Sequence, residues 1–194
     1  MGGFIGNNYG GTIRRSYSTG NASSSSVVGG FCGSVQSNSS QNSIIENCYS
    51  TGNASGNAVV GGFCGSLEQS SGTASISNCF SIGSPTASSY LGGFIGLLTS
   101  GTLYCNYWAG TPSDGISDTG NPSDEPDNEI MKMVIADFSS LSNCPCFSRV
   151  NWRIDYGATH PLLNTIPTLS EWATIAFLSL ILIFGAFFVY KRIV

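Results

Sequence analysis

The chain has 194 residues, of which only 9% are charged, and its formal net charge is −4. Soluble domains carry about 25% charged residues, and nucleic-acid-binding proteins present a basic surface, so no nucleic-acid partner is expected. A surface of Ser, Asn, Thr and Gly in place of ions is typical of an extracellular structural protein, and the length suffices for one domain and an appendage.

The pentad Gly-Gly-Phe-x-Gly occurs four times, each time followed by a polar stretch and then by a second short apolar block. The pentads lie at Gly2–Gly6, Gly29–Gly33, Gly61–Gly65 and Gly92–Gly96, and the second blocks at Ile13–Gly20, Ile45–Gly52, Ile76–Gly83 and Leu103–Trp108. The pentad phenylalanines are spaced by 27, 32 and 31 residues, and a period of about 20–50 residues indicates stacked repeats. A flexible Gly/Ser linker is the alternative, but linkers do not keep aromatic residues in register.

Each repeat reads as short strands separated by turns rich in Ser, Asn and Gly. In one second block, alternation places Ile45, Asn47 and Tyr49 on one face and Cys48 on the other, and we expect the first face to be the core. The paired glycines of each pentad would weaken a strand unless a neighbouring backbone must come close. They therefore predict a close backbone approach in every repeat.

Stacked repeats share an interior that one repeat alone cannot bury. With about 30 residues per repeat and no helical periodicity, residues 1–108 are predicted to form an all-β, parallel β-solenoid of about four repeats. A β-propeller is the alternative, but its blades need about 40 residues. The residues expected in the repeat core are Phe4, Phe31, Phe63, Phe94, Tyr17, Tyr49 and Phe80.

Five of the seven cysteines lie in the repeats: Cys32, Cys48, Cys64, Cys79 and Cys105. Equivalent positions in stacked coils lie about 4.8 Å apart, which is within the Cα range of a disulfide. Parallel side chains are poorly oriented for the S–S torsion, so we expect buried free thiols in preference to disulfides. The segment Cys144-Pro145-Cys146 is not a CxxC motif, and no matching pair for a zinc site is present in the sequence.

The order GGFxG, I-x-N-C-Y-S-T-G-N-A-S-G, V-V-G-G-F over residues 1–108 resembles the GLUG repeat of bacterial surface and adhesin-like proteins. Such proteins often continue with an NYW block, an acidic loop, a short EMK-like helix and a closing W-x-I-D-x-G segment. Here these correspond to Asn106–Trp108, a helix at Asn128–Lys132, and Trp152–Gly157 followed by His160–Leu163. The resemblance implies an extracellular β-solenoid with a terminal cap, and it does not imply an enzyme.

Residues 109–164 are therefore expected to form an acidic loop and a capping segment. Six of the eleven acidic residues lie between positions 110 and 129. Carboxylates on a flexible loop can bind Ca²⁺, but the EF-hand spacing is absent from the sequence. We expect a solvated acidic loop and no metal site.

The tail, residues 165–194, contains 18 successive uncharged residues at Ala173–Tyr190, which as a helix would reach about 27 Å and span a membrane. Lys191 and Arg192 follow it as a membrane stop. The preceding motif resembles the IPTL-type C-terminal sorting signal of Gram-negative bacteria, which implies recognition by an exosortase-like enzyme. The motif residues are Ile166, Pro167, Thr168, Leu169, Ser170, Glu171 and Trp172. A plain C-terminal anchor is the alternative.

The N-terminal segment has neither the charged n-region nor the apolar h-region of an export signal, and the sequence opens inside a repeat at Met1–Phe4. A sorted protein needs export, so we expect a fragment or a misplaced start. The alternative is a tail-anchored cytoplasmic protein.

Catalytic chemistry is not expected. His160 is the only histidine, no G-x-S-x-G motif accompanies it, and we expect it to serve in packing or at the surface. The repeats hold two acidic residues, Glu46 and Glu68, in non-equivalent positions, whereas glycoside-cleaving sites need clustered carboxylates. No cofactor or metal is expected.

The sequence therefore predicts an exported structural or adhesive repeat protein of the cell surface or matrix, inserted in the membrane at least transiently and cleaved through its C-terminal signal. The expected partners are the membrane, an exosortase-like processing enzyme, and a surface glycan or protein ligand. Two alternatives remain open: the C-terminal fragment of a carbohydrate-active β-helix enzyme, and an inert tail-anchored remnant.

Overall fold

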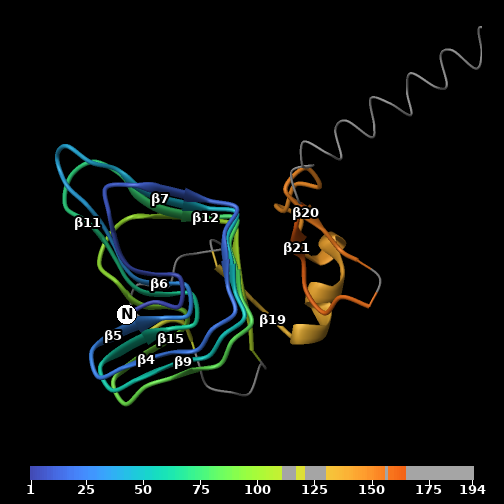
Figure 1. Cartoon of the computed structure of the whole chain (residues 1–194), viewed down its shortest axis with the longest axis horizontal. Coiled ribbons are helices and arrows are strands. Elements are labelled where there is room, and N and C mark those ends of the chain that lie inside the picture. The colour runs from blue at the N-terminus through green and yellow to red at the C-terminus, as the bar shows by residue number, and fades with distance from the viewer. Residues whose placement is uncertain (111–116, 121–129, 156, 165–194) are drawn as a thin grey trace, which may run out of the picture. The chain divides into compact units, whose positions relative to one another are not determined.

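The computed structural model describes residues 1–110, 117–120, 130–155 and 157–164. They belong almost entirely to the first of two compact units, Met1–Leu163. This unit is a parallel β-solenoid, as predicted, in which successive coils stack so that each strand pairs with its counterpart in the next coil (Figure 1).

Four parallel sheets run along the stack, and each is named here by its strands in spatial order. The first contains β1 (Ile5–Tyr9), β6 (Cys32–Ser37), β11 (Cys64–Gln69), β15 (Tyr90–Leu98), β10 (Val59–Gly61) and β5 (Val27–Gly29), with β18 (Ser117–Thr119) paired to β15. The second contains β16 (Thr102–Tyr104), β12 (Ala74–Ser77), β7 (Ser43–Glu46) and β2 (Thr12–Arg14). The third contains β19 (Ile130–Met133), β17 (Asn106–Ala109), β13 (Phe80–Ser81), β8 (Tyr49–Ser50) and β3 (Tyr17–Ser18). The fourth contains β14 (Pro85–Thr86), β9 (Ala54–Gly56) and β4 (Ala22–Ser24).

The solenoid makes about three turns, fewer than the four expected from the repeats. The fourth repeat supplies β15, β16 and β17, but among the described residues it adds no strand to the sheet of β4, β9 and β14. Its sequence departs from the repeat after Trp108, where it has no counterpart of the YSTGNAS block of the first two copies or of the FSIGSPT block of the third.

The pentad phenylalanines form a ladder inside the solenoid. Phe63 stacks on Phe31 and on Phe94 with ring centroids 4.9 Å apart on each side, and all three side chains are fully buried. The expectation is wrong for Phe4, which is 50% exposed because it is the first rung and stacks only on Phe31. The other rungs are confirmed as core.

A left-handed corner overturns the predicted alternation in the second blocks. Asn47 has φ of 52°, and the equivalent corner residues Arg15, Asn78 and Cys105 have φ between 49° and 55°. This conformation reverses the side-chain order, so Cys48 joins Ile45 in the interior while the ring after it points outward.

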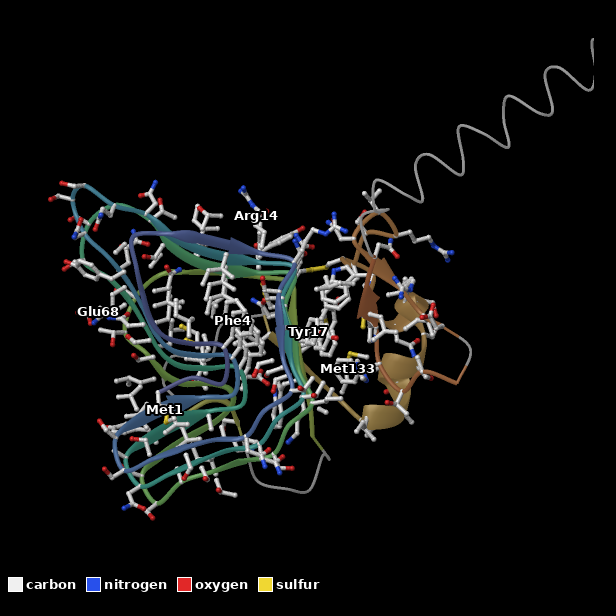
Figure 2. The ribbon with its side chains drawn as sticks, in the orientation of Figure 1. Met1, Phe4, Arg14, Tyr17, Glu68 and Met133 are labelled. Atoms are coloured by element: carbon white, nitrogen blue, oxygen red, sulfur yellow. A yellow bond between two sulfur atoms is a disulfide. The ribbon has the colours of Figure 1, made fainter. Side chains whose placement is uncertain are left out.

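The aromatic rungs of the second blocks consequently form an outer ladder. Tyr17, Tyr49 and Phe80 stack in parallel on the outer face of β3, β8 and β13, and Figure 2 shows Phe4 inside the coil and Tyr17 on its outer side. Tyr49 and Phe80 are buried, but outside the solenoid interior in which they were expected. Tyr17 is 56% exposed, so its assignment to the core is wrong.

The pentad glycines confirm the predicted close approach of backbones. A Cβ added to Gly62 would lie 2.2 Å from the carbonyl oxygen of Gly93 and 3.0 Å from Ser81 Oγ. From the facing strand, Ser50 Oγ donates a hydrogen bond of 3.0 Å to the Gly62 carbonyl oxygen. The glycine pairs therefore leave room for the backbone of the next coil and for a serine hydroxyl of the facing strand, both of which a Cβ would displace.

A short helix was expected at 128–132, but residues 130–132 of that segment lie in a strand, and residues 128 and 129 lie outside the described part of the chain. In β19 the side chain of Ile130 joins the solenoid interior, and that of Met131 packs with the outer aromatic residues. This alternation suits a strand, and β19 pairs in parallel with β17, whose edge would otherwise present unpaired backbone groups.

After β19 the chain forms a small cap, residues 135–163. It contains the 3₁₀ helices η2 (Ile135–Ser139) and η3 (Leu141–Asn143) and the antiparallel pair β20 (Trp152–Arg153) and β21 (Leu162–Leu163). Three buried aromatic side chains of the cap pack on the outer ladder, namely Phe138, Phe147 and Trp152. The cap thus buries the outer face of the third sheet at β8, β13 and β17, but not at β3, and the inner face of the sheet lies against the solenoid interior.

Candidate functional site

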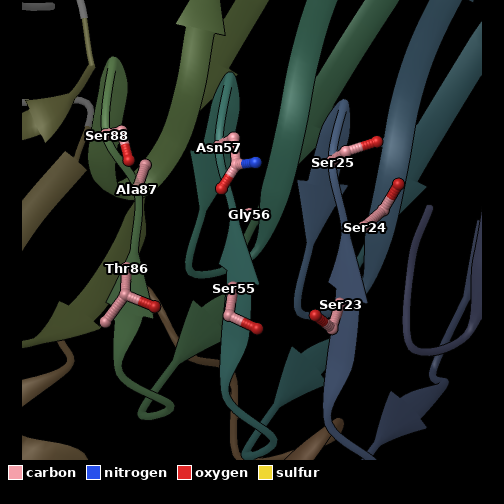
Figure 3. Close-up of a pocket in the computed structure, with 9 residues that line it drawn as sticks. All are labelled: Ser23, Ser24, Ser25, Ser55, Gly56, Asn57, Thr86, Ala87 and Ser88. Atoms are coloured by element: carbon pink, nitrogen blue, oxygen red, sulfur yellow. The ribbon is translucent and has the colours of Figure 1, made fainter.

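A groove open to solvent runs across three successive coils on the outside of the fourth sheet (Figure 3). We call it the hydroxyl groove. Its volume is about 540 Å³, and its lining residues are Ser23, Ser24, Ser25, Ser55, Gly56, Asn57, Thr86, Ala87 and Ser88. Each coil contributes one triplet, which comprises residues of β4, β9 or β14 and of the turn that follows.

Strand alternation determines which side chains face the groove. Ala22, Ala54 and Pro85 are buried beneath it, and the first two pack with Val28 and Val60 in a small core of their own. The next residue in each strand points outward, and pairing places Ser23 beside Ser55 and Ser55 beside Thr86. A second outward row, in the turns, consists of Ser25, Asn57 and Ser88.

An asparagine ladder fixes the turns that lead into these strands. The Asn21 side-chain oxygen accepts a 2.9 Å hydrogen bond from the amide of Asn53, and the Asn53 side-chain oxygen accepts one of the same length from the amide of Ser84. Each bond crosses from one coil to the next, so it holds the three triplets in register. The groove is therefore built on a fixed backbone.

The lining can form hydrogen bonds but holds no ionisable side chain. The hydroxyls of Ser23, Ser55 and Thr86 form no hydrogen bond with another described group of the protein and face solvent, whereas Ser24 Oγ accepts one from the amide of Ser26. A serine or threonine hydroxyl can donate and accept. The groove can therefore bind polar, uncharged groups, and none of its lining side chains is a carboxylate, imidazole, thiol or amine.

The charged side chains of the repeats lie on other strands. Arg14 pairs with Glu46 across β2 and β7, and Glu68 Oε2 accepts a 3.2 Å hydrogen bond from Gln36 Nε2 on the neighbouring strand. Arg14 and Glu68 both point outward at sites away from the groove (Figure 2). These groups support the stack from coil to coil.

His160 lies in the cap, with its ring 5.6 Å from that of Tyr49 and 6.0 Å from that of Phe80. Burial lowers the pKa of its imidazole, since the charged form loses hydration. The expected packing role agrees with these contacts. Among the described residues, no group of three or more His, Cys, Asp or Glu side chains could hold a metal ion.

The repeat cysteines are free thiols with one exception. Cys32, Cys48, Cys64 and Cys79 are buried and unpaired by disulfides, as expected, and burial raises the pKa of the Cys64 and Cys79 thiols well above the usual value. Cys105 departs from the expectation, because it forms a disulfide with Cys146 of the cap, with Cα atoms 6.0 Å apart. The left-handed corner at Cys105 directs this one side chain to the cap.

The expected sorting motif at residues 166–172 and the membrane stop at Lys191 and Arg192 lie outside the described residues, as does the expected span at residues 173–190. Within the described ranges, no helix has the length and apolar character needed to cross a membrane.

The turn that runs from the first groove triplet to the second has a recognisable sequence. The family model of the GLUG motif matches residues 24–55. This stretch is one complete turn of the solenoid, because Ser24 pairs with Gly56 in the next coil. The match supports a GLUG-repeat protein, and the structure shows that one GLUG motif corresponds to one coil. No curated protein and no solved structure matches the chain.

The groove itself was not anticipated from the sequence. Its signal is the segment Asn-Ala-Ser, which recurs at Asn21–Ser23 and Asn53–Ser55. Within that segment, the structure uses the asparagine for the ladder, the alanine for the core and the serine for the groove.

Proposed function

We propose that this protein is an exported structural and adhesive repeat protein of the cell surface or matrix, and that its tail directs sorting and cleavage. The observation that carries the adhesive role is the hydroxyl groove, a binding surface without charge on a fixed stack of coils. The solenoid acts as the scaffold that presents it.

The disulfide Cys105–Cys146 supports the extracellular location. Disulfides persist in oxidising compartments and are rare in the cytosol. This bond joins the last corner of the solenoid to the cap, so it ties the cap covalently to the last repeat.

A non-catalytic role fits the lining of the groove. Most glycoside hydrolases use two carboxyl groups that flank the scissile bond. The residues that line the groove are Ser, Thr, Asn, Gly and Ala, and none of them carries a carboxyl group. Binding without turnover is what these residues support.

The C-terminus of the mature protein in its native host tests the sorting role. Mass spectrometry should find a chain that ends near residues 166–169, released from its apolar tail, and protease added to intact cells should degrade it. Pro167→Ala should block cleavage but leave membrane insertion unchanged, because the substitution alters the extended approach to the helix and spares the apolar span.

The comparison variant is Lys191→Glu together with Arg192→Glu. It should disturb the orientation of the inserted helix, since the basic residues that flank a membrane span set its orientation. A mature chain that still ends at Val194 and is found in the membrane fraction would show that the tail is a plain membrane anchor and not a cleaved sorting signal. A chain protected from external protease would overturn the surface role.

A further inference from the structure

The hydroxyl groove has the capacity of a ligand site. Its volume of about 540 Å³ falls within the range of about 300–1,000 Å³ found for small-molecule sites. It also extends over three coils, so an occupant would lie along the solenoid axis, across the strands β4, β9 and β14.

The hydroxyls in the groove form a periodic array. Ser23, Ser55 and Thr86 occupy equivalent positions in paired strands, and paired strands lie about 4.8 Å apart. The turn residues Ser25, Asn57 and Ser88 form a parallel second row (Figure 3). A ligand that presents hydroxyl groups at intervals along its length can bond to both rows at each coil.

The chemistry of the lining favours one class of polymer. No cationic side chain is present to hold an anionic polymer, and no anionic side chain is present to hold a basic one. A peptide strand would need an unpaired edge, but β9 is already paired on both sides, with β4 and with β14. An apolar helix would need apolar side chains, and here Ala22, Ala54 and Val60 face inward.

We propose that the hydroxyl groove binds a neutral saccharide chain that lies across three coils and is held by hydrogen bonds from its two rows of side chains. This proposal rests on the proposed adhesive function and names the ligand class for it. Saccharide hydroxyls donate and accept, as do those of Ser23, Ser55 and Thr86, which have no partner within the described part of the chain. The asparagine ladder holds the rows in place before binding, which lowers the entropic cost of association.

Titration calorimetry on the full chain tests the proposal, with cellohexaose, maltohexaose and mannohexaose as probes. The detergent must carry a zwitterionic headgroup, since a sugar headgroup would compete for the groove. At least one neutral probe should bind, and its affinity should be the same in low and high salt, because no ion pair contributes.

The decisive variant is Ser55→Ala with Thr86→Val, which removes two hydroxyls from exposed or half-exposed strand positions. A hydrogen bond contributes about 0.5–1.5 kcal/mol, so the loss of two such bonds should weaken binding by about 5- to 160-fold. The matched control is Ser75→Ala with Thr102→Val, an in-register serine and threonine on β12 and β16, outside the groove. The control should bind as the parent does, and both variants should retain the parent circular dichroism spectrum.

Three results would overturn the proposal: no binding of any neutral probe, equal binding by the groove variant and the control, or a preference for charged polygalacturonate or for protein over the neutral probes. None of these bears on where the chain resides. If the chain is surface-exposed and processed but binds no neutral saccharide, the surface role stands and the saccharide ligand is refuted. If the chain is protected from external protease but binds neutral saccharides, the ligand stands and the surface role is refuted.

Discussion

Removal of the central ring from the interior ladder should destabilise the solenoid strongly. Phe63 is fully buried and stacks on a ring on each side at 4.9 Å. Replacement of a buried Phe by Ala costs about 3–5 kcal/mol, and aromatic stacking adds about 0.5–1.5 kcal/mol per pair. For a chain of this size, a loss of this magnitude lowers the melting temperature by about 10 °C or more.

The same substitution at Phe4 provides a matched control. Phe4 belongs to the same ladder, but it is 50% exposed and stacks on one neighbour, at 4.8 Å. Roughly half of the burial loss and the loss of one stacking contact apply here, so we expect Phe4→Ala to cost about 2–4 kcal/mol, about half the cost of Phe63→Ala.

Circular dichroism of the full chain in detergent, followed through urea denaturation without reductant, measures both losses. Equal losses for Phe63→Ala and Phe4→Ala would show that the ladder does not stabilise the chain through burial. A Phe63→Ala chain as stable as the parent would refute the stacked interior altogether.

Two further predictions concern the glycine pairs and the cap. Gly62→Ala should lower the melting temperature well beyond Gly20→Ala, because an added Cβ would lie 2.2 Å from the Gly93 carbonyl oxygen at the first position and meets nothing within 4 Å at the second; equal melting temperatures would contradict the close approach. Burial holds the pKa of His160 below its usual value near 6.5, so the neutral imidazole stabilises the cap above that pH and this contribution is lost as the pH falls through the folded pKa. Tryptophan fluorescence, which reports on buried Trp152, should therefore show a cap that unfolds more easily at pH 5 than at pH 8, and His160→Gln should abolish that difference.

The sequence was sufficient for the architecture because the repeats carry their own register. Phe31, Phe63 and Phe94 recur at a coil-length spacing, and stacking them dictates parallel pairing along the axis. The glycine pairs were also informative, since only a close backbone explains two glycines in every copy.

The predicted alternation of side chains was wrong at the corners of the coils, so the assignment of residues to the inner and outer faces was wrong there too. The left-handed conformation at Asn47, which Asn adopts more readily than most residues, breaks the alternation and sends Cys48 inward and Tyr49 outward. The pairing of Cys105 with Cys146 was equally inaccessible, because the partners are 41 residues apart and meet only when the cap packs on the outer ladder. The groove was missed because its serines resemble those of a linker until pairing aligns them.

The disulfide also determines how the chain would respond to a mechanical pull at the C-terminal side of the cap. Tension entering at Leu163 would run back to Cys146, cross to Cys105 and enter the solenoid there. The intervening residues 106–145, which include β17 and β19, are bypassed by the covalent shortcut and carry no tension. A tether at this end could therefore straighten only the cap residues beyond Cys146, and the last paired strands of the stack would stay closed while the rest of the molecule is strained.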